Sequence, residues 1–114
     1  MPVVIKIKGN EMTAFIKGEV DHHTVPSVRD KIDDALLVNE QIKKVVIDFD
    51  GVTFMDSSGV GLVMGRYRIV SKKGQSLSVR NLSERDYKIM KMSGIEKLAK
   101  ISKKDETKRF GDIV

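Results

Sequence analysis

Asp56-Ser57-Ser58-Gly59-Val60-Gly61 lies where a predicted strand gives way to a predicted helix. Before it, residues 44–49 (Lys-Val-Val-Ile-Asp-Phe) have a continuous apolar centre, which indicates a buried strand. Asp50-Gly51 then reads as a turn. Beyond the motif, apolar residues recur at helical spacing across residues 60–70. The motif therefore occupies the amino end of a helix, where Asp and Ser oxygens accept hydrogen bonds from unpaired backbone N–H groups.

Three glycines fall in this short helix, at positions 59, 61 and 65. In an exposed helix interior each costs roughly 1 kcal/mol relative to alanine, so their presence needs an explanation. Gly61 and Gly65 share a face and would admit a close approach to the backbone; for Gly65, packing within the domain explains the glycine equally well. At Gly59 we expect a partner or a phosphate to approach, because the position is too close to the helix end to need a core explanation.

Length and composition indicate one globular domain spanning residues 1–114. A hydrophobic content of 40% with 32% charged residues is typical of a folded chain and not of a disordered one. No apolar run approaches the length of a membrane span, so we expect neither a membrane partner nor an export signal. The chain has no cysteine, which excludes disulfides and thiolate chemistry and fits a cytoplasmic location.

The net charge of +5 raises the question of nucleic-acid binding. Basic residues are interleaved with acidic ones, as in Arg29-Asp30-Lys31, and only 5% of residues are aromatic, so no basic stripe with stacking platforms forms. We therefore expect no nucleic-acid partner. The excess charge suits a solvated face or an acidic protein partner.

The rest of the chain alternates between strand and helix patterns. Alternating apolar residues predict strands at 3–8, 12–17 and 75–80, the first two joined by a Gly9-Asn10 hairpin signal. A polar loop at 18–24 leads to an amphipathic helix capped by Thr24. Ser83 caps a further helix that Gly94 closes.

The end of the chain has the weakest pattern. Residues 95–101 read as a short extended piece, followed by a last helix that begins near Ser102 to Asp105 and buries Phe110. The resulting order predicts an α/β fold: a mostly parallel mixed sheet of four to five strands, packed with about four helices.

Several chemistries fit the residues poorly. Asp21-His22-His23 supplies two adjacent histidines where catalytic zinc needs three protein ligands and an open site, so we expect no metal. The serines lack the Gly-x-Ser-x-Gly pattern of a hydrolase, and the motif lacks the lysine and glycine spacing of a Walker A loop. We therefore expect no catalytic residue and no cofactor, although a nucleotide-binding or weakly hydrolytic domain remains an alternative hypothesis for this helix end.

A serine that receives a phosphate from another protein fits best. Backbone N–H groups and the helix dipole tolerate a phosphoserine at a helix amino end, so the fold would persist while the surface gains about two negative charges beside Asp56. If that surface binds a partner, phosphorylation acts as a switch. These arguments do not distinguish Ser57 from Ser58.

Three segments resemble one bacterial family. The family is the STAS-domain anti-sigma-factor antagonists, and the resemblance is greatest to those of the sporulation type. The similar segments follow one another along the chain as they do in the family. They are residues 18–24 (Gly-Glu-Val-Asp-His-His-Thr), residues 54–61 with Gly65-Arg66-Tyr67, and Met92-Ser93-Gly94-Ile95. Val20 and Val60 replace the commoner leucines. The segment after Ser102 matches least.

The resemblance implies a regulatory binding protein and not an enzyme. The unphosphorylated form would bind an anti-sigma factor with serine kinase activity, and phosphorylation of Ser57 by that kinase would release it. A serine phosphatase would restore the active form, and the free protein would be a monomer. Five residues would line the docking surface: Asp21, His22, Asp56, Ser58 and Gly59. The alternative within the same family is a scaffold domain of a stress-signalling assembly.

Overall fold

Residues 2–104 are described by the computed structural model. In chain order the elements are β1 (Val3–Lys8), β2 (Glu11–Val20), α1 (Val25–Val38), β3 (Lys44–Met55), α2 (Ser57–Lys72), β4 (Ser76–Leu82), α3 (Glu84–Met92), a 3₁₀ turn (Ile95–Lys97) and β5 (Lys100–Lys103).

The five strands form a single sheet in the order β1-β2-β3-β4-β5. β1 and β2 pair antiparallel, whereas every other neighbouring pair is parallel. The hairpin between β1 and β2 turns through Gly9, whose φ of 60° is in the left-handed region that glycine adopts without strain. The predicted fold class, an α/β domain with a mostly parallel mixed sheet, is confirmed, with three α-helices in residues 2–104 where about four were expected.

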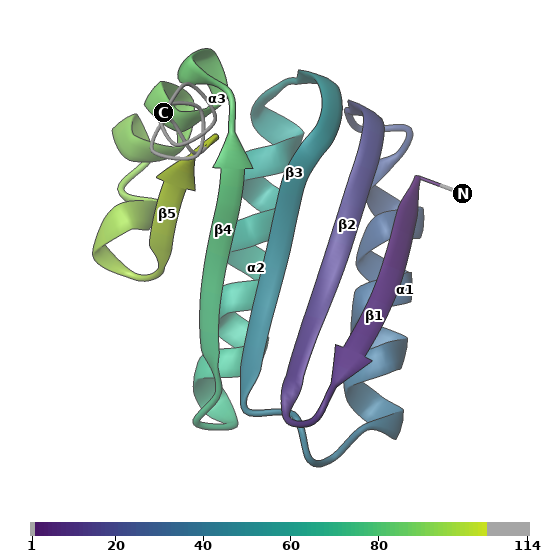
Figure 1. Ribbon diagram of the computed structural model, residues 1–114. Helices are drawn as coiled ribbons and strands as arrows, with labels where there is room; N and C mark the ends of the chain where they lie inside the picture. The colour runs from purple at the N-terminus through teal and green to yellow at the C-terminus, as the bar shows by residue number, and fades with distance from the viewer. Residues whose placement is uncertain (1, 105–114) are drawn as a thin grey trace, which may run out of the picture.

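α1 and α2 lie on the same face of the sheet, and the chain returns through them between parallel strands (Figure 1). Inward-facing residues of the three central strands pack against these helices and form the core. Its members include Met12, Ala14, Ile16, Val28, Ile32, Leu36, Val45, Ile47, Phe49, Leu62, Val63, Val70, Leu77 and Val79. This layer fixes the position of the α2 amino end relative to the sheet.

β3 is longer than the sequence predicts. Asp50-Gly51, read as a turn, lies inside the strand, which continues to Met55. The pairing of β2 with β3 shifts register between Phe15 and Lys17. At this bulge a Cβ on Gly51 would lie 2.9 Å from the Lys17 Cβ and 3.0 Å from the Ile16 carbonyl oxygen. Gly51 therefore allows a close approach of two strands and does not turn the chain.

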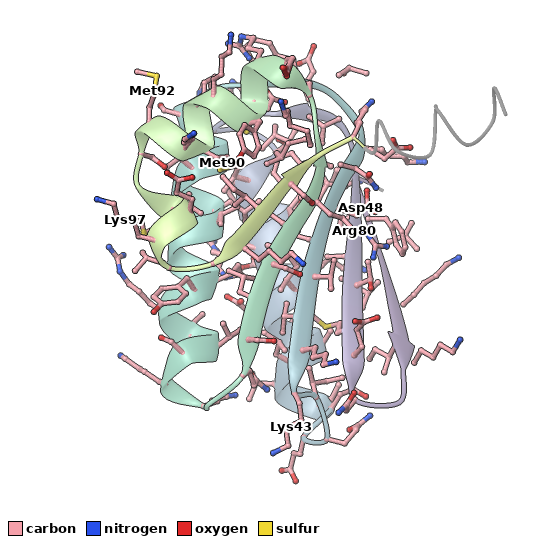
Figure 2. All side chains as sticks on the ribbon, turned by 60° about the vertical axis from the view of Figure 1, so that its left-hand side comes forward. Lys43, Asp48, Arg80, Met90, Met92 and Lys97 are labelled. Atoms are coloured by element: carbon pink, nitrogen blue, oxygen red, sulfur yellow. The ribbon has the colours of Figure 1, made fainter. Side chains whose placement is uncertain are left out.

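The end of the described chain also departs from expectation. Ser102 and Lys103 lie in β5, so a helix beginning at Ser102 is wrong, while Phe110 lies outside the described residues. In α3, Met90 points into the core and Met92 points away from the molecule (Figure 2). Gly94, with a φ of 87°, ends this helix as predicted.

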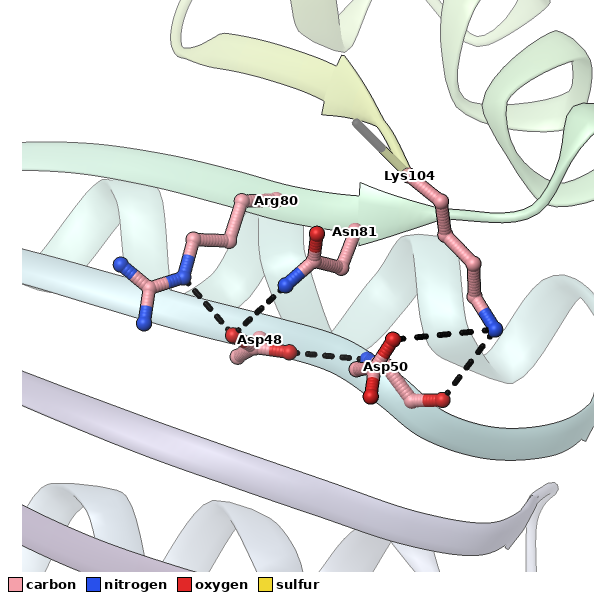
Figure 3. A network of polar contacts seen from close by, with 5 residues as sticks. All are labelled: Asp48, Asp50, Arg80, Asn81 and Lys104. Carbon is pink, nitrogen blue, oxygen red and sulfur yellow. Dashed lines mark hydrogen bonds and ion pairs between the residues drawn. The ribbon is translucent and has the colours of Figure 1, made fainter. Parts of the chain in front are cut away.

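The face of the sheet opposite α1 and α2 carries a polar network centred on Asp48 (Figure 3). The buried Asp48 carboxylate accepts hydrogen bonds from Arg80 Nε at 2.7 Å, Asn81 Nδ2 at 3.0 Å and the Asp50 backbone N–H at 2.8 Å. Lys104 Nζ in turn contacts the Asp50 carbonyl oxygen at 3.3 Å. These contacts tie β3 to β4 and to the chain beyond β5.

Candidate functional site

The candidate site is formed where β2 and β3 end side by side. Val20 and Met55 are partners in the parallel register, and the Asp56 N–H donates to the Val20 carbonyl oxygen at 3.1 Å. The loop after β2 and the start of α2 therefore lie next to each other at the carboxyl edge of the sheet, where ligands of open α/β sheets bind. The structure thus brings together Asp21 and Asp56, which are 35 positions apart in the numbering.

Asp56 caps α2 as predicted. Its backbone is extended and its carboxylate accepts a hydrogen bond from the Ser58 N–H at 2.8 Å. Ser57, the first helical residue, is exposed, whereas Ser58 is half-buried and faces α1 across a cleft. The two serines therefore differ in accessibility, a difference that is absent from the sequence.

Gly59 has a different role from the one expected. It is buried, and a Cβ there would lie 2.5 Å from Met55 Cγ, 2.6 Å from Met55 Sδ and 3.3 Å from Val20 Cγ1. Core packing beneath the first turn of α2 explains the glycine, so the expectation that Gly59 needs no core explanation is wrong, while its contact with a partner stays a prediction. A predicted contact of Gly59 with a partner would involve backbone atoms only.

At Gly61 and Gly65 the surroundings are open. Apart from the adjacent residues and the backbone of α2 itself, no atom of the described chain would lie within 4 Å of a Cβ at either position. Packing within residues 2–104 therefore does not explain Gly65. For both glycines the prediction that remains is that another molecule approaches the helix backbone there.

Asp21 organises the loop between β2 and α1. Its Oδ1 accepts hydrogen bonds from the His23 N–H at 2.9 Å and the Thr24 N–H at 3.0 Å. The hydrogen bond from Thr24 holds the Asp21 pKa below its usual value, helped by the His23 N–H and the two nearby imidazoles and opposed by desolvation. Asp21 is therefore a carboxylate near neutral pH, fixed in position by the backbone of its own loop.

Thr24 does not cap α1 through its side chain, in contrast to the prediction. Its hydroxyl donates to the Glu19 carbonyl oxygen at 2.8 Å and accepts from the Asp21 N–H at 3.0 Å. These bonds close the loop, so the threonine supports Asp21 instead of the helix. β2 itself extends to Val20, which shortens the predicted loop to residues 21–24.

His22 and His23 are both exposed, and their ring centroids lie 4.0 Å apart. Within residues 2–104 no group of three His, Asp or Glu side chains is placed to hold a metal ion. In the same part of the chain, no helix combines the length and apolar character needed to cross a membrane.

Two residues beside the motif were not assigned a role from sequence. Phe54 is 46% exposed, although it is a large aromatic residue near the end of a strand. Arg85, from the first turn of α3, places its guanidinium 5.7 Å from the Phe54 ring centroid and donates from Nη1 to the Met55 carbonyl oxygen at 2.9 Å. The pair adjoins the serine motif, because Phe54 precedes Asp56 by two residues and Arg85 contacts Met55, the residue between them. In the sequence, the only sign of this pair is that Phe54 is an aromatic residue next to the serine motif, because Arg85 is distant along the chain.

A cleft of about 340 Å³ opens between the amino-terminal turns of α1 and α2. His22, Arg29, Ser58 and Arg66 are among its lining residues, so it adjoins the site. Arg66 Nε lies 2.9 Å from Asp33 Oδ1. Desolvation raises the Asp33 pKa and lowers the Arg66 pKa, and in each case the charge of the other partner opposes the shift. A larger cleft of about 620 Å³ lies at the other end of α2.

Comparison with known proteins gives concordant matches. Residues 2–107 match the family model described as STAS domain. The chain is 34% identical over 104 residues to the anti-sigma-B factor antagonist of Bacillus subtilis, covering 91% of this chain and 93% of that protein. It is 35% identical over 86 residues to the anti-sigma F factor antagonist of Paenibacillus polymyxa, covering 75% and 73%.

Solved structures of the anti-sigma factor antagonist SpoIIAA are also similar. The unphosphorylated form superposes with a TM-score of 0.71 at 25% identity, covering 97% of this chain and 96% of that one. The phosphorylated form from Bacillus gives a TM-score of 0.70 at 26% identity, covering 98% and 99%.

Proposed function

The chain belongs to the STAS-domain family of anti-sigma-factor antagonists, and from this premise we propose that its unphosphorylated form binds an anti-sigma factor with serine kinase activity. Binding would free the sigma factor for transcription. The kinase would then phosphorylate Ser57 and the complex would dissociate. The protein would act in the cytoplasm as a binder and substrate, with the kinase supplying the catalytic base and Mg-ATP.

The observation that carries this proposal is the exposure of Ser57 at the amino end of α2. A kinase active site must reach the acceptor hydroxyl, and the exposed Ser57 meets that requirement better than the half-buried Ser58. Similarity to a protein solved in both unphosphorylated and phosphorylated forms supports control by phosphorylation, without bearing on which serine is modified.

The charge mechanism follows from the neighbours of Ser57. Asp56 caps the same turn, and the loop carboxylate of Asp21 lies at the adjoining strand end, so a phosphate would add to an existing negative field. Once desolvated against a partner, such a charge would remove about 3–4 kcal/mol of binding, a few hundred-fold in affinity. The hydrogen bonds of the first turn and the dipole tolerate the phosphate, so the fold would remain intact.

The docking surface in this proposal comprises the five residues expected from the sequence, extended by Phe54 and Arg85. The five are Asp21, His22, Asp56, Ser58 and the backbone of Gly59. Phe54 is an exposed aromatic residue beside an arginine, and aromatic residues and arginine are both enriched in protein interfaces. A serine phosphatase would bind the phosphorylated form at the same exposed turn and regenerate the antagonist.

The direct test is to incubate the protein with a cognate anti-sigma factor kinase and ATP, and to map the phosphate by mass spectrometry. We expect a single phosphate on Ser57, lost in Ser57→Ala and retained in Ser58→Ala. A phosphate on another residue, or none with an active kinase, would contradict the assignment.

A further inference from the structure

The face of the sheet opposite α1 and α2 carries a set of cationic side chains. Along each strand these outward-facing residues alternate with core residues, because successive side chains point to opposite faces. The strand register aligns them in rows across the sheet, on the side turned toward the viewer in Figure 1. The rows are Val4-Phe15-Asp48-Arg80, Lys6-Thr13-Val46-Ser78-Lys100 (the middle row) and Lys8-Glu11-Lys44-Ser76.

The acidic groups of this face are matched by cations of the same face. Asp48 is buried and pairs with Arg80 at 2.7 Å. Asp50 pairs with Lys104, whose Nζ lies 3.8 Å from the carboxylate. Glu11 lies between two lysines of its row. No carboxylate of these rows therefore remains to balance the other cations.

Three exposed lysines of the face have no acidic partner among residues 2–104: Lys6, Lys17 and Lys100. Lysines on edge strands prevent unwanted pairing with other chains, which would account for Lys6 on β1 and Lys100 on β5. Lys17 is in β2, which has a neighbouring strand on each side, so edge protection does not account for it. The face as a whole therefore presents an excess of positive charge to any molecule that approaches it.

The middle row has the shape for a chain segment to lie on it. Its three central residues, Thr13, Val46 and Ser78, have short side chains, and a lysine stands at each end. Five strands about 4.8 Å apart place the two ends roughly 19 Å from each other, the length of about six extended residues. A short polypeptide segment can therefore contact the small residues and both lysines together.

The same residues favour a protein over a nucleic acid or a membrane. Single-stranded nucleic acids need free aromatic rings for base stacking, but the Phe15 ring already has Lys6 Nζ at 5.7 Å and Arg80 Cζ at 5.8 Å from its centroid. Insertion into a membrane needs a broad apolar surface, and Val4 is the exposed apolar residue of the three rows. An acidic protein surface requires only complementary charge and room for close approach.

We propose that this face binds an acidic segment of a partner protein, which crosses the middle row and places carboxylates at Lys6 and Lys100. Lys8, Lys17 and Lys44 would add to the field that attracts it. This binding shares no residue with the docking surface at the start of α2. It depends neither on Ser57 nor on an anti-sigma factor, so either proposal can fail without the other.

The test is a titration of the ¹⁵N-labelled protein with a synthetic peptide in which glutamate alternates with threonine, followed by NMR at low ionic strength. Saturable shifts are expected for the amides of Thr13, Val46 and Ser78, and added sodium chloride should weaken the binding. A peptide of glutamine and threonine is the uncharged control and should not bind.

A pair of double variants tests the location. Lys6→Gln with Lys100→Gln is expected to lower the affinity for the glutamate peptide about tenfold. Lys31→Gln with Lys72→Gln removes the same charge from exposed positions of α1 and α2, across the sheet, and should change the affinity less than about twofold.

Four results would overturn the proposal. Two concern charge: equal binding of the glutamine peptide, or an equal loss of affinity in the two double variants. The third is a response to the glutamate peptide that does not saturate. The fourth is tighter binding of a single-stranded oligonucleotide or of phosphatidylserine vesicles at the same amides, which would assign the face to another class of partner.

Discussion

The first turn of α2 packs on Met55, and Gly59 makes that contact possible. A methyl group at Gly59 would overlap Met55 Cγ and Sδ, which belong to a fully buried side chain that would have to shift within the core. At Gly65, on the same helix, a methyl group would meet open space within the described chain. The same substitution therefore has opposite effects at two glycines six residues apart.

We predict that Gly59→Ala lowers the free energy of unfolding, because overpacking costs about 1–3 kcal/mol and exceeds the gain of about 1 kcal/mol in helix propensity. Gly65→Ala is the matched control and should raise the free energy of unfolding by about 0.5–1 kcal/mol. Urea denaturation measures both. Equal stabilisation by the two substitutions would show that Met55 is not packed against Gly59.

Asp21 makes the loop sensitive to acid. Its folded pKa is lowered, so its stabilising effect is present above its ordinary value near 3.8 and is lost as the pH falls through the lower folded pKa. An NMR titration of the Asp21 carboxyl carbon is expected to give a midpoint below 3.8. Asp21→Asn should reduce the dependence of stability on pH in this acid range, and a midpoint at or above 3.8 would contradict the hydrogen bonding of the loop.

Phe54 tests the extent of the docking surface. Phe54→Ala should weaken binding to the anti-sigma factor about tenfold or more, because truncating a residue that carries much of an interface's binding energy costs about 2 kcal/mol or more. Leu37→Ala is the control, since Leu37 is 70% exposed but lies near the carboxyl end of α1. Binding measured by calorimetry should be unchanged by Leu37→Ala. Equal effects of both substitutions would remove Phe54 from the surface.

At the scale of elements, α2 is held in place at its N-cap residue, Asp56. The Asp56 carboxylate accepts from Ser58, and the Asp56 N–H donates to the end of β2, so the helix start is fixed to the neighbouring strand. This double attachment positions Ser57 outward. In the proposed switch, phosphorylation at this turn would change charge without removing either hydrogen bond.

The cap itself can be tested by substitution. Asp56→Ala should lower the free energy of unfolding by about 1 kcal/mol, the usual effect of losing a helix cap. Asp56→Asn keeps an oxygen that accepts the Ser58 N–H and should retain most of that stability. Chemical denaturation distinguishes the two. Wild-type stability of Asp56→Ala would mean that the hydrogen bond does not support the helix.

Elements whose signals are local were predictable from the sequence. The caps at Asp56 and Ser83, and the left-handed glycines at 9 and 94, obey rules that depend on a few neighbouring residues. Thr24 was mispredicted because its hydroxyl bonds to the Glu19 carbonyl oxygen within the loop, an alternative available to the same side chain.

Features that depend on tertiary contacts were not predictable. Asp50-Gly51 has the residues of a turn, but β2 approaches so closely at its bulge that the glycine is needed within the strand. The role of Gly59 depends on where the Met55 side chain lies, and the pairing of Phe54 with Arg85 joins residues 31 positions apart. The strand at 100–103 forms by pairing with β4, and its own sequence is too short to specify it.

At the scale of the whole molecule, the proposed docking surface lies at one edge of the sheet. The parallel strands β2 and β3 end together, and their loops carry Asp21 and the serine motif, while α1 and α2 cover one face and hold both loops in place (Figure 1). The Asp48 network ties the central strands on the other face. A rigid platform of this kind fits a switch that acts through surface charge and not through refolding.

The measurement that tests this account most directly is the affinity of a cognate anti-sigma factor kinase for the protein before and after phosphorylation of Ser57. Affinity should fall a few hundred-fold on phosphorylation and less, about tenfold or more, in Ser57→Asp, which adds one charge instead of about two. Ser71→Asp adds the same charge at an exposed position near the other end of α2 and should bind like the unmodified protein. Equal affinity of the phosphorylated and unmodified forms would contradict the account.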